Sequence, residues 1–340
     1  MINILHFNNR STVTKVIYVI IAVLSIAAIG YGLPQPVDNP VGDSVTIVVK
    51  SGMTTQTISD MLYERGIIKS GFVFRVVARI KGLSNTLKAG EYTFNKDMSI
   101  IEMVGVLGRG ETENKDLTVP EGYTINQIAE LIEQKKMGSA QKFRDAAASF
   151  APFDYMISSS PVVYKAEGYV FPDTYKIATD ATEAQILEMM VNQFDSKFTP
   201  EMRQKANNLG LSIREVVILA SLVEKEARVA DERPVIAGVF RNRIKAGMAL
   251  QSCATIQYIL GHPKSELTIQ DTEIPSDYNT YLHPGLPPGP ISNPGLASIN
   301  AVLNPVKTDY LYFVADKKGE HHRFSRTYTE HLAAIEQENK

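Results

Sequence analysis

Ser212-Ile-Arg-Glu-Val-Val-Ile-Leu-Ala-Ser-Leu-Val-Glu-Lys-Glu226 is the stretch around which the fold of this chain is predicted to form. Ser212 and Glu215 have the three-residue spacing of a capping box, which predicts the start of a helix. Apolar residues then recur at steps of three and four and form a stripe along one face of the predicted helix: Val216, Leu219, Leu222 and Val223. The stripe continues into Glu226 at the same helical spacing.

The carboxyl group of Glu226 is a candidate general acid. A carboxyl on the apolar side of a helix loses hydration, which favours its neutral form and raises its pKa toward that of a working acid. Glu224 lies two residues earlier, so it is predicted to face a different side of the helix. On spacing alone, Glu-Lys-Glu at a helix end is more typical of a solvated surface. The assignment therefore depends on the rest of the chain.

Length and composition indicate a globular protein of about two domains. The chain has 340 residues, of which 44% are hydrophobic and 21% are charged. The formal net charge of −2 gives no reason to expect a nucleic-acid partner. Cys253 is the one cysteine in the sequence, so an internal disulfide is impossible.

An uncharged N-terminal stretch predicts a membrane anchor. Residues 16–33 carry no charge, and a helix of this length spans about 27 Å. Arg10 and Lys15 precede it, which places residues 1–15 in the cytoplasm and residues 34–340, beginning with the 34–44 linker, outside it. The sequence thus predicts a single-pass protein of the plasma (inner) membrane. A cleaved signal peptide is the alternative, although no clear small-x-small cleavage site follows a shorter apolar core.

Residues 45–115 are predicted to form a small βα subdomain. Val49-x-x-Gly-x-Thr-x-x-x-Ile58 matches Val119-x-x-Gly-x-Thr-x-x-x-Ile128, and each copy is typical of a strand, a glycine turn and a capped helix. Two copies are too few for a repeat architecture. The pattern resembles LysM-type glycan-binding modules, although the motif alone favours a scaffold role over binding.

Residues 116–340 are predicted to form a larger α+β domain. A helix capped by Thr182 and Gln185 is expected to run to Phe198, with Ile186, Met189, Met190 and Phe194 pointing inward. The proline- and glycine-rich loop 276–295 carries Tyr, Asn, Ser and Thr side chains that suit a sugar cleft. A purely structural loop is an equally good interpretation of this composition.

Five blocks read together resemble the endolytic murein transglycosylase family (MltG, also called YceG-like). The similarity covers the chain from about Val45 to its C-terminus, in the family's order and behind the family's N-terminal span. The blocks are 167–175, 220–226 (Ala-Ser-Leu-Val-Glu-Lys-Glu), 242–252, 278–295 and 310–316.

This resemblance implies a lyase that cleaves peptidoglycan glycan strands at the bond between N-acetylmuramic acid and N-acetylglucosamine and leaves 1,6-anhydro ends. It implies Glu226 as the catalytic acid, a LysM-like subdomain, no cofactor and no metal. It also implies partners: the glycan strands, the membrane and peptidoglycan synthases (penicillin-binding proteins). The substrate-binding set that it implies is Glu167, Gln251, Ser252, Thr255, Tyr278, Asn279, Ser292 and Asn293.

The chain departs from the family pattern beside the predicted site. The family commonly reads Gln-Ser-Asp-Pro-Thr where this chain has Gln-Ser-Cys253-Ala254-Thr, and His283 stands where Tyr is common. If the missing Asp orients substrate or keeps Glu226 protonated, the enzyme is expected to be slower or to have a shifted pH optimum. A catalytically impaired wall-binding or scaffold protein of the same fold is therefore the main alternative.

Two other enzyme classes are open but less well supported. A cysteine peptidase would use Cys253 with His283, but the surrounding residues match no nucleophile signature. A metal hydrolase would use His321, His322 and His331, whose spacing is not that of a chelating motif.

Overall fold

We describe a computed structural model of the chain, which covers residues 44–50, 52–84, 86–95, 98–110, 114–264 and 266–338. The predicted transmembrane helix 16–33 and its flanks 1–15 and 34–43 lie outside these residues. The chain divides into two compact units, one of residues up to 115 together with 178–180, and one of residues 116–177 and 181–340. Each unit is described by itself.

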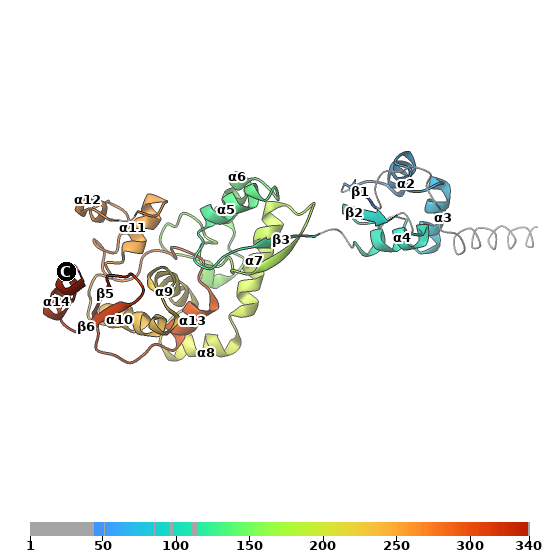
Figure 1. The fold of residues 1–340 in the computed structure, drawn as a ribbon. Helices are drawn as coiled ribbons and strands as arrows, with labels where there is room; N and C mark the ends of the chain where they lie inside the picture. Colours follow the sequence, from blue (N-terminus) through green and yellow to red (C-terminus); the bar gives the residue numbers. More distant parts are fainter. Residues whose placement is uncertain are drawn as a thin grey trace, which may run out of the picture. The chain divides into compact units, whose positions relative to one another are not determined.

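The smaller unit is a two-stranded sheet covered by helices (Figure 1). Strand β1 (Ser44–Val49) runs antiparallel to β2 (Gly90–Asn95), with Val49 opposite Gly90. Alternate strand residues enter the core, where Ile47 and Tyr92 are almost completely buried beside Phe74. The helices are α2 (Thr55–Glu64) and α3 (Gly71–Ile80) between the strands, and α4 (Ile100–Arg109) after them.

The two matching sequence segments fold alike, as their pattern predicted. Gly52 and Gly122 both adopt left-handed backbone conformations, with φ of 84° and 74°, which glycine reaches without steric cost. Thr54 and Thr124 then cap helices by accepting a hydrogen bond from a backbone N–H three residues later. In each copy the isoleucine that follows is completely buried.

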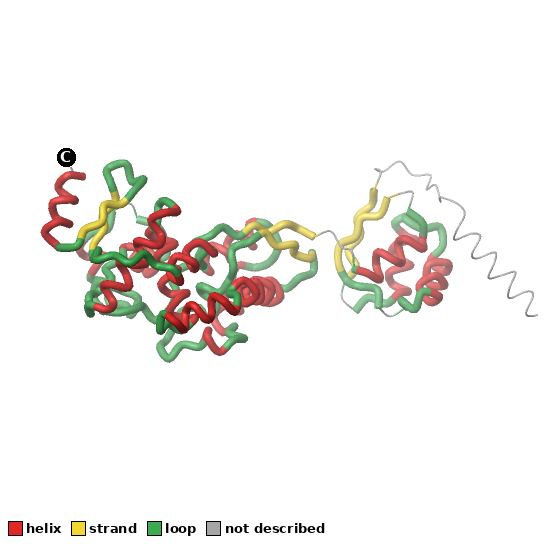
Figure 2. Tube along the Cα trace, turned by 90° about the horizontal axis from the view of Figure 1, so that it is seen from below, coloured by secondary structure: helices red, strands yellow, loops and turns green. Residues whose placement is uncertain are grey.

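The larger unit has mixed α+β structure in which helices predominate (Figure 2). Its strands form two short pairs among the described residues: β3 (Asn114–Thr118) with β4 (Thr174–Ala178), and β5 (Tyr312–Ala315) antiparallel to β6 (His322–Ser325). The fold class predicted from the sequence is confirmed at this level. The helices are α5 (Ile125–Gln134), α6 (Ala140–Ser149), α7 (Glu183–Lys197), α8 (Pro200–Asn208), α9 (Ile213–Glu226), α10 (Arg233–Lys245), α11 (Cys253–Leu260), α12 (Ile269–Thr272), α13 (Leu296–Leu303) and α14 (Tyr328–Glu338), with 3-10 turns at Asp154–Met156 and Ala230–Glu232.

Helix α9 forms the centre of this unit, with α10 and α13 beside it (Figure 1). The capping box predicted at Ser212 and Glu215 is present, with both reciprocal hydrogen bonds. Every residue from Val216 to Val223 is buried, because α8, α10, α11 and α13 all pack against the helix. The sequence predicted a single apolar stripe, whereas the structure buries all faces of this segment.

Helix α7 corrects one inward assignment. Ile186, Met190 and Phe194 are buried as predicted, but Met189 is 39% exposed. Leu187 and Val191 take the inward positions instead. At 100° per residue these buried side chains share one face, whereas Met189 lies well outside it.

Among the described residues, no single helix is long and apolar enough to cross a membrane. Helices α8 and α9 reach that length and hydropathy only as a pair, which is bent by 91°.

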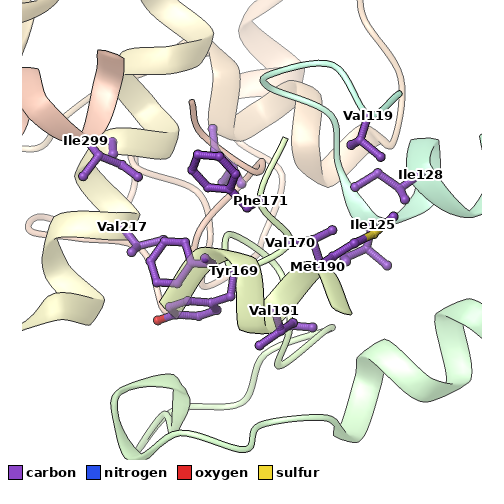
Figure 3. Packing of buried hydrophobic residues seen from close by; sticks show 14 of the residues in the cluster. Val119, Ile125, Ile128, Tyr169, Val170, Phe171, Met190, Val191, Val217 and Ile299 are labelled. Carbon is purple, nitrogen blue, oxygen red and sulfur yellow. The ribbon is translucent and has the colours of Figure 1, made fainter. Parts of the chain in front are cut away.

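The segment 166–171 crosses the core of the larger unit and connects its two sides. Figure 3 shows Tyr169 on the side of Val217, and Val170 on the side of Ile125 and Met190. At Gly168 the chain has φ of 87°, and an added Cβ would lie 2.5 Å from Cβ of Pro290 and 2.8 Å from Cγ1 of Val217. Only glycine therefore fits this crossing without displacing backbone or core side chains.

Gly168→Ala should destabilise the larger unit by about 3 kcal/mol, because the left-handed conformation costs roughly 1–2 kcal/mol and overpacking adds a similar amount. Denaturant unfolding of the full chain measures the change. Gly210→Ala is the matched control, since Gly210 has φ of 69° with nothing within 4 Å of an added Cβ. It should lose about 1 kcal/mol. Equal losses in the two variants would contradict the packing argument.

Candidate functional site

Glu226 is the last residue of α9, and its side chain meets the first turn of α11. The Ser252 hydroxyl donates a hydrogen bond to Oε1 of Glu226, and the backbone N–H of Ala254 also donates to this carboxyl group. Ser252 occupies the N-cap position of α11 but makes no side-chain cap hydrogen bond of the usual kind. The Glu226 carboxylate takes over that function, because it satisfies an N–H that the helix itself leaves free.

Burial dominates the electrostatics of Glu226. It raises the pKa of this carboxyl above its usual value, because the charged form loses hydration. The hydrogen bonds from Ser252 and Ala254 and the nearby charges of His322 and Arg228 act in the opposite direction but do not cancel the effect. The half-buried side chain can therefore hold a proton at a pH where an exposed glutamate is ionised.

A strained turn positions Ser252 against the carboxyl. Gln251 has φ of 50°, an uncommon conformation for a residue with a side chain. Arg243 holds this turn by donating to the backbone oxygen of Leu250 at 2.6 Å and to Oε1 of Gln251 at 3.0 Å. Thr280 holds it from the other side, since its hydroxyl oxygen accepts the Ser252 N–H at 3.0 Å.

Two pockets lie next to the contact between α9 and α11. The first, of about 250 Å³, contains Tyr164, Gln257 and Tyr258. The second, of about 440 Å³, contains Glu226, Gln251 and Tyr281. Lys225 lines both pockets, and the neighbours Cys253 and Ala254 line one each. The carboxyl of Glu226 therefore lines one of two neighbouring polar and aromatic pockets, an arrangement that suits a long polymer better than a small molecule.

Glu224 has a different environment from Glu226, as its helical position predicted. Its Oε2 accepts the backbone N–H of Gly295 at 3.1 Å, and its Oε1 lies 3.9 Å from Nη2 of Arg233. The side chain is 7% exposed and does not line either pocket. Glu224 thus ties α9 to the start of α13.

Glu167 is buried inside the unit rather than in a cleft. It accepts hydrogen bonds from the backbone N–H of Ile125, from Nδ2 of Asn293 at 3.0 Å and from the Tyr258 hydroxyl at 3.3 Å. Burial raises the pKa of Glu167 to about 8, and the hydrogen bonds from Ile125, Tyr258 and Asn293 oppose this rise. The residue fixes the start of α5 and, through Tyr258, one wall of the first pocket.

Of the other predicted substrate-binding residues, Gln251 lines the second pocket and Ser252 contacts Glu226. The rest are buried and bonded within the protein. Asn279, for example, donates to the backbone oxygens of Thr272 and Ile274 and accepts the N–H of Tyr281, which shapes the loop. Direct contact with a glycan stays a prediction for this set. The buried members are Thr255, Tyr278, Asn279, Ser292 and Asn293.

Cys253, His322 and His331 all line the second pocket, but each has different contacts. The Cys253 sulfur lies 3.1 Å from the Tyr281 hydroxyl, and burial raises the pKa of the thiol, which disfavours the nucleophilic thiolate. His321 and His322 both contact Glu232, whereas His331 stacks on Tyr312. Within the described residues, no group of three or more His, Cys, Asp or Glu side chains is arranged to hold a metal ion.

The predicted set omitted most side chains that line the second pocket. They come from parts of the chain as much as a hundred residues apart. Arg243, Tyr281 and Tyr312 fall inside the blocks on which the family resemblance rests, whereas Arg228, His322 and His331 do not. No local pattern marked the others. The omitted residues include Arg228, Arg243, Tyr281, Tyr312, His322 and His331.

Fold and site together define an α+β protein in which one acid, a carboxyl with a raised pKa, lines a polar pocket. The chain belongs to the YceG-like family, whose model matches residues 47–337. Two relatives are called endolytic murein transglycosylase. The one from Streptococcus pneumoniae strain D39 is 34% identical over 310 residues, and the one from Bacillus subtilis strain 168 is 33% identical over 320 residues.

Coverage differs between these relatives. The alignment takes in 83% of this chain and 56% of the pneumococcal protein, so the chain spans little more than half of that relative's length. For the Bacillus protein the shares are 90% and 88%. A crystal structure of a YceG-like protein from Listeria monocytogenes superposes with a TM-score of 0.61 at 32% identity, covering 86% of this chain and 99% of that one.

Ser252→Ala should raise the pKa of Glu226 further, because it removes a hydrogen bond that favours the ionised carboxylate. NMR titration of the labelled Glu226 side chain measures the shift. Ser212→Ala is the matched control: it removes a serine hydroxyl from the opposite end of α9 and should cost about 1 kcal/mol of stability without moving this pKa. An unchanged pKa of Glu226 in Ser252→Ala would show that the hydrogen bond from Ser252 does not stabilise the ionised carboxylate.

Proposed function

We propose that this chain is an endolytic peptidoglycan lytic transglycosylase, with Glu226 as its catalytic acid and base. The observation that carries the proposal is the half-buried carboxyl of Glu226, whose pKa is raised and which lines the second pocket, next to the first. The names of the relatives point to the same substrate and reaction. Cleavage within nascent strands would end their elongation.

The reaction needs one group that first donates a proton and then accepts one. The protonated Glu226 gives its proton to the oxygen between N-acetylmuramic acid and N-acetylglucosamine, and this oxygen leaves as the sugar's hydroxyl. The muramic C6 hydroxyl attacks C1 and closes a 1,6-anhydro ring, while the Glu226 carboxylate takes the hydroxyl proton. Glu226 returns to its starting state, and no water is consumed.

The distribution of acids favours this lyase chemistry over hydrolysis. Inverting and retaining glycosidases use a second carboxylate as base or nucleophile. Among the described residues that line the two pockets, Glu226 is the only acid. Glu224 is bonded to Gly295 and close to Arg233, and Glu167 is buried under three donors. Neither is free to activate a water molecule or to attack a sugar.

The Cys253-Ala254 pair should tune this acid rather than remove it. The backbone N–H of Ala254 stabilises the ionised form of Glu226, and a proline at this position would have no N–H to offer. A cysteine also brings no negative charge beside Glu226, unlike the family's aspartate. Both changes lower the pKa of Glu226 relative to the family pattern, so we expect a lower pH optimum. The intact contact between Glu226 and Ser252 favours turnover over a purely scaffolding role.

The smaller unit supports a role in glycan binding. Its β1–α2–α3–β2 order and antiparallel sheet suit the LysM-like module suggested by the sequence. Such a module would hold the strand while the larger unit cleaves it, and would work beside peptidoglycan synthases that extend the strand.

Glu226→Gln should abolish cleavage, with a loss of at least about 10³-fold, because an amide cannot donate the proton yet keeps the shape of the side chain. Mass spectrometry of digested glycan strands detects fragments with anhydro ends, which are lighter by one water than hydrolysis products. Glu224→Gln is the matched control on the same helix and should act more mildly. Full activity of the Glu226 variant would refute the assignment.

We further propose that residues 16–33 anchor the protein in the plasma membrane, with the N-terminus in the cytoplasm and both units outside it. The uncharged length of this stretch and the basic residues before it support the proposal. A reporter that is active only outside the cytoplasm, fused after Lys340, should be active and should sediment with membranes. Reversing the flanking charges with Arg10→Glu and Lys15→Glu should reduce that activity. A soluble reporter fusion would contradict anchoring.

A further inference from the structure

Arg243 is a buried cation that has no acidic partner among the described residues. Its residue surface is 7% exposed, and its two guanidinium hydrogen bonds go to neutral oxygens of Leu250 and Gln251. Its Nε is buried without any hydrogen-bond partner. Because a buried charge is costly unless it is paired, proteins normally place a carboxylate beside it. Arg243 is missing that partner.

The surroundings of Arg243 compensate for its charge only in part. The guanidinium lies 5.3 Å from the centre of the Tyr312 ring, a cation–π contact that stabilises the charge only in part. His331 stacks on the same tyrosine at 5.2 Å, and its buried Nδ1 also has no partner. Burial and the charge of Arg243 both lower the pKa of His331, which favours the neutral ring, so His331 neither offsets the charge of Arg243 nor adds to it.

The same cavity contains other cations and one acid. Arg243, Arg228 and Lys225 all line the second pocket, and Glu226 is the acid among its described lining residues. When Glu226 is protonated for catalysis, the pocket therefore holds three positive charges and no negative one. A field of this sign attracts an anion and disfavours a cation.

A purely structural role does not account for this arrangement. Hydrogen bonds to the backbone oxygen of Leu250 and the amide oxygen of Gln251 require a donor but no charge. The second positive charge, on Arg228, does not contribute to holding this turn. Neither does the turn explain why the polar atoms of two different side chains lack partners. A negatively charged ligand in the pocket supplies the counter-charge that Arg243 lacks, although the two buried nitrogens have too little exposed surface to contact it.

We propose that the second pocket is a subsite for a carboxylate carried by the sugar next to the bond that is cleaved, with Arg243 and Arg228 supplying its positive charge. This inference rests on the proposed function. In strands without peptides, the carboxylate is the free lactyl acid of N-acetylmuramic acid. In peptide-bearing strands that acid is amidated, and the carboxylate comes from the stem peptide.

Chemically modified substrates test the subsite with the unaltered full chain in detergent. Peptide-free strands and peptide-bearing strands are each compared with the same strands after their carboxylates have been converted to neutral amides. We expect kcat/KM for anhydro-ended products to fall by about tenfold or more on amidation, since a hydrogen bond to a charged group contributes roughly 1.5–3 kcal/mol. The strand type with the larger fall identifies the source of the carboxylate.

Two variants separate the pocket's charge from its shape. Arg228→Gln removes a charge from an exposed side chain that does not hold the 250–252 turn, and it should reduce the preference for carboxylate over amide by about threefold or more. Because the preference is a ratio of two substrates, any effect of Arg228 on Glu226 cancels. Arg241→Gln is the control: Arg241 lies on the same helix but lines a separate pocket with Asn242 and Lys245, so the ratio should not change.

The outcomes distinguish the subsite from the proposed reaction. Anhydro-ended products formed equally well from charged and neutral strands would overturn the subsite while leaving the reaction standing. A preference that Arg228→Gln and Arg241→Gln reduce alike would overturn the assignment to this pocket. Failure to form anhydro-ended products from any strand would overturn the reaction itself, and carboxylate-dependent binding of the Glu226→Gln variant would then be the remaining test of the subsite.

Discussion

The contact between the end of α9 and the start of α11 is the interaction on which the site depends. A helix buried along most of its length delivers Glu226 to a place where its carboxyl is only partly hydrated. The first turn of α11 meets this carboxyl with Ser252 and the Ala254 N–H. Burial alone would make the group too weak an acid to release its proton, and the donors alone would keep it ionised. The balance between burial and hydrogen bonding gives a carboxyl that can hold a proton and can also release it.

The rest of the larger unit holds these two helix ends in register. Arg243 and Thr280 hold the strained turn at Gln251 from opposite sides. The buried hydroxyl of Ser221, in the middle of α9, accepts the N–H of Ile291 at 3.1 Å and so ties the proline-rich loop to the same helix. Residues far from the chemistry therefore contribute to it by fixing distances that a small shift would spoil.

Three glutamates of the larger unit have different environments, although they are chemically identical. Glu167 is fully buried among hydrogen-bond donors, Glu224 joins two helices beside an arginine, and Glu226 borders the clefts. Only the last combines a raised pKa with access for a polymer. An acid–base assignment at such a site therefore follows from surroundings and not from residue type.

The local structure of this chain could be read from its sequence to a large extent. Capping boxes at Ser212 and Thr182 and the glycine turns at Gly52 and Gly122 predicted where helices begin, because those signals act within a few residues. The inward position of Met189 was predicted wrongly, since apolar character does not determine which face a neighbouring element will cover. For the same reason the sequence did not reveal that residues 216–223 of α9 are buried on all faces.

What the sequence determined by itself was the set of elements, the α+β class and the candidate acid, since periodicity and capping are properties of neighbouring residues. Which polar residues face a cleft and which hold loops together was decided only by the tertiary structure. Asn279 and Asn293 are completely buried, whereas Arg243, Tyr312 and His331 meet in one pocket from separate parts of the chain. Such contacts depend on long-range packing, and a local pattern carries no information about which distant segment will complete a site.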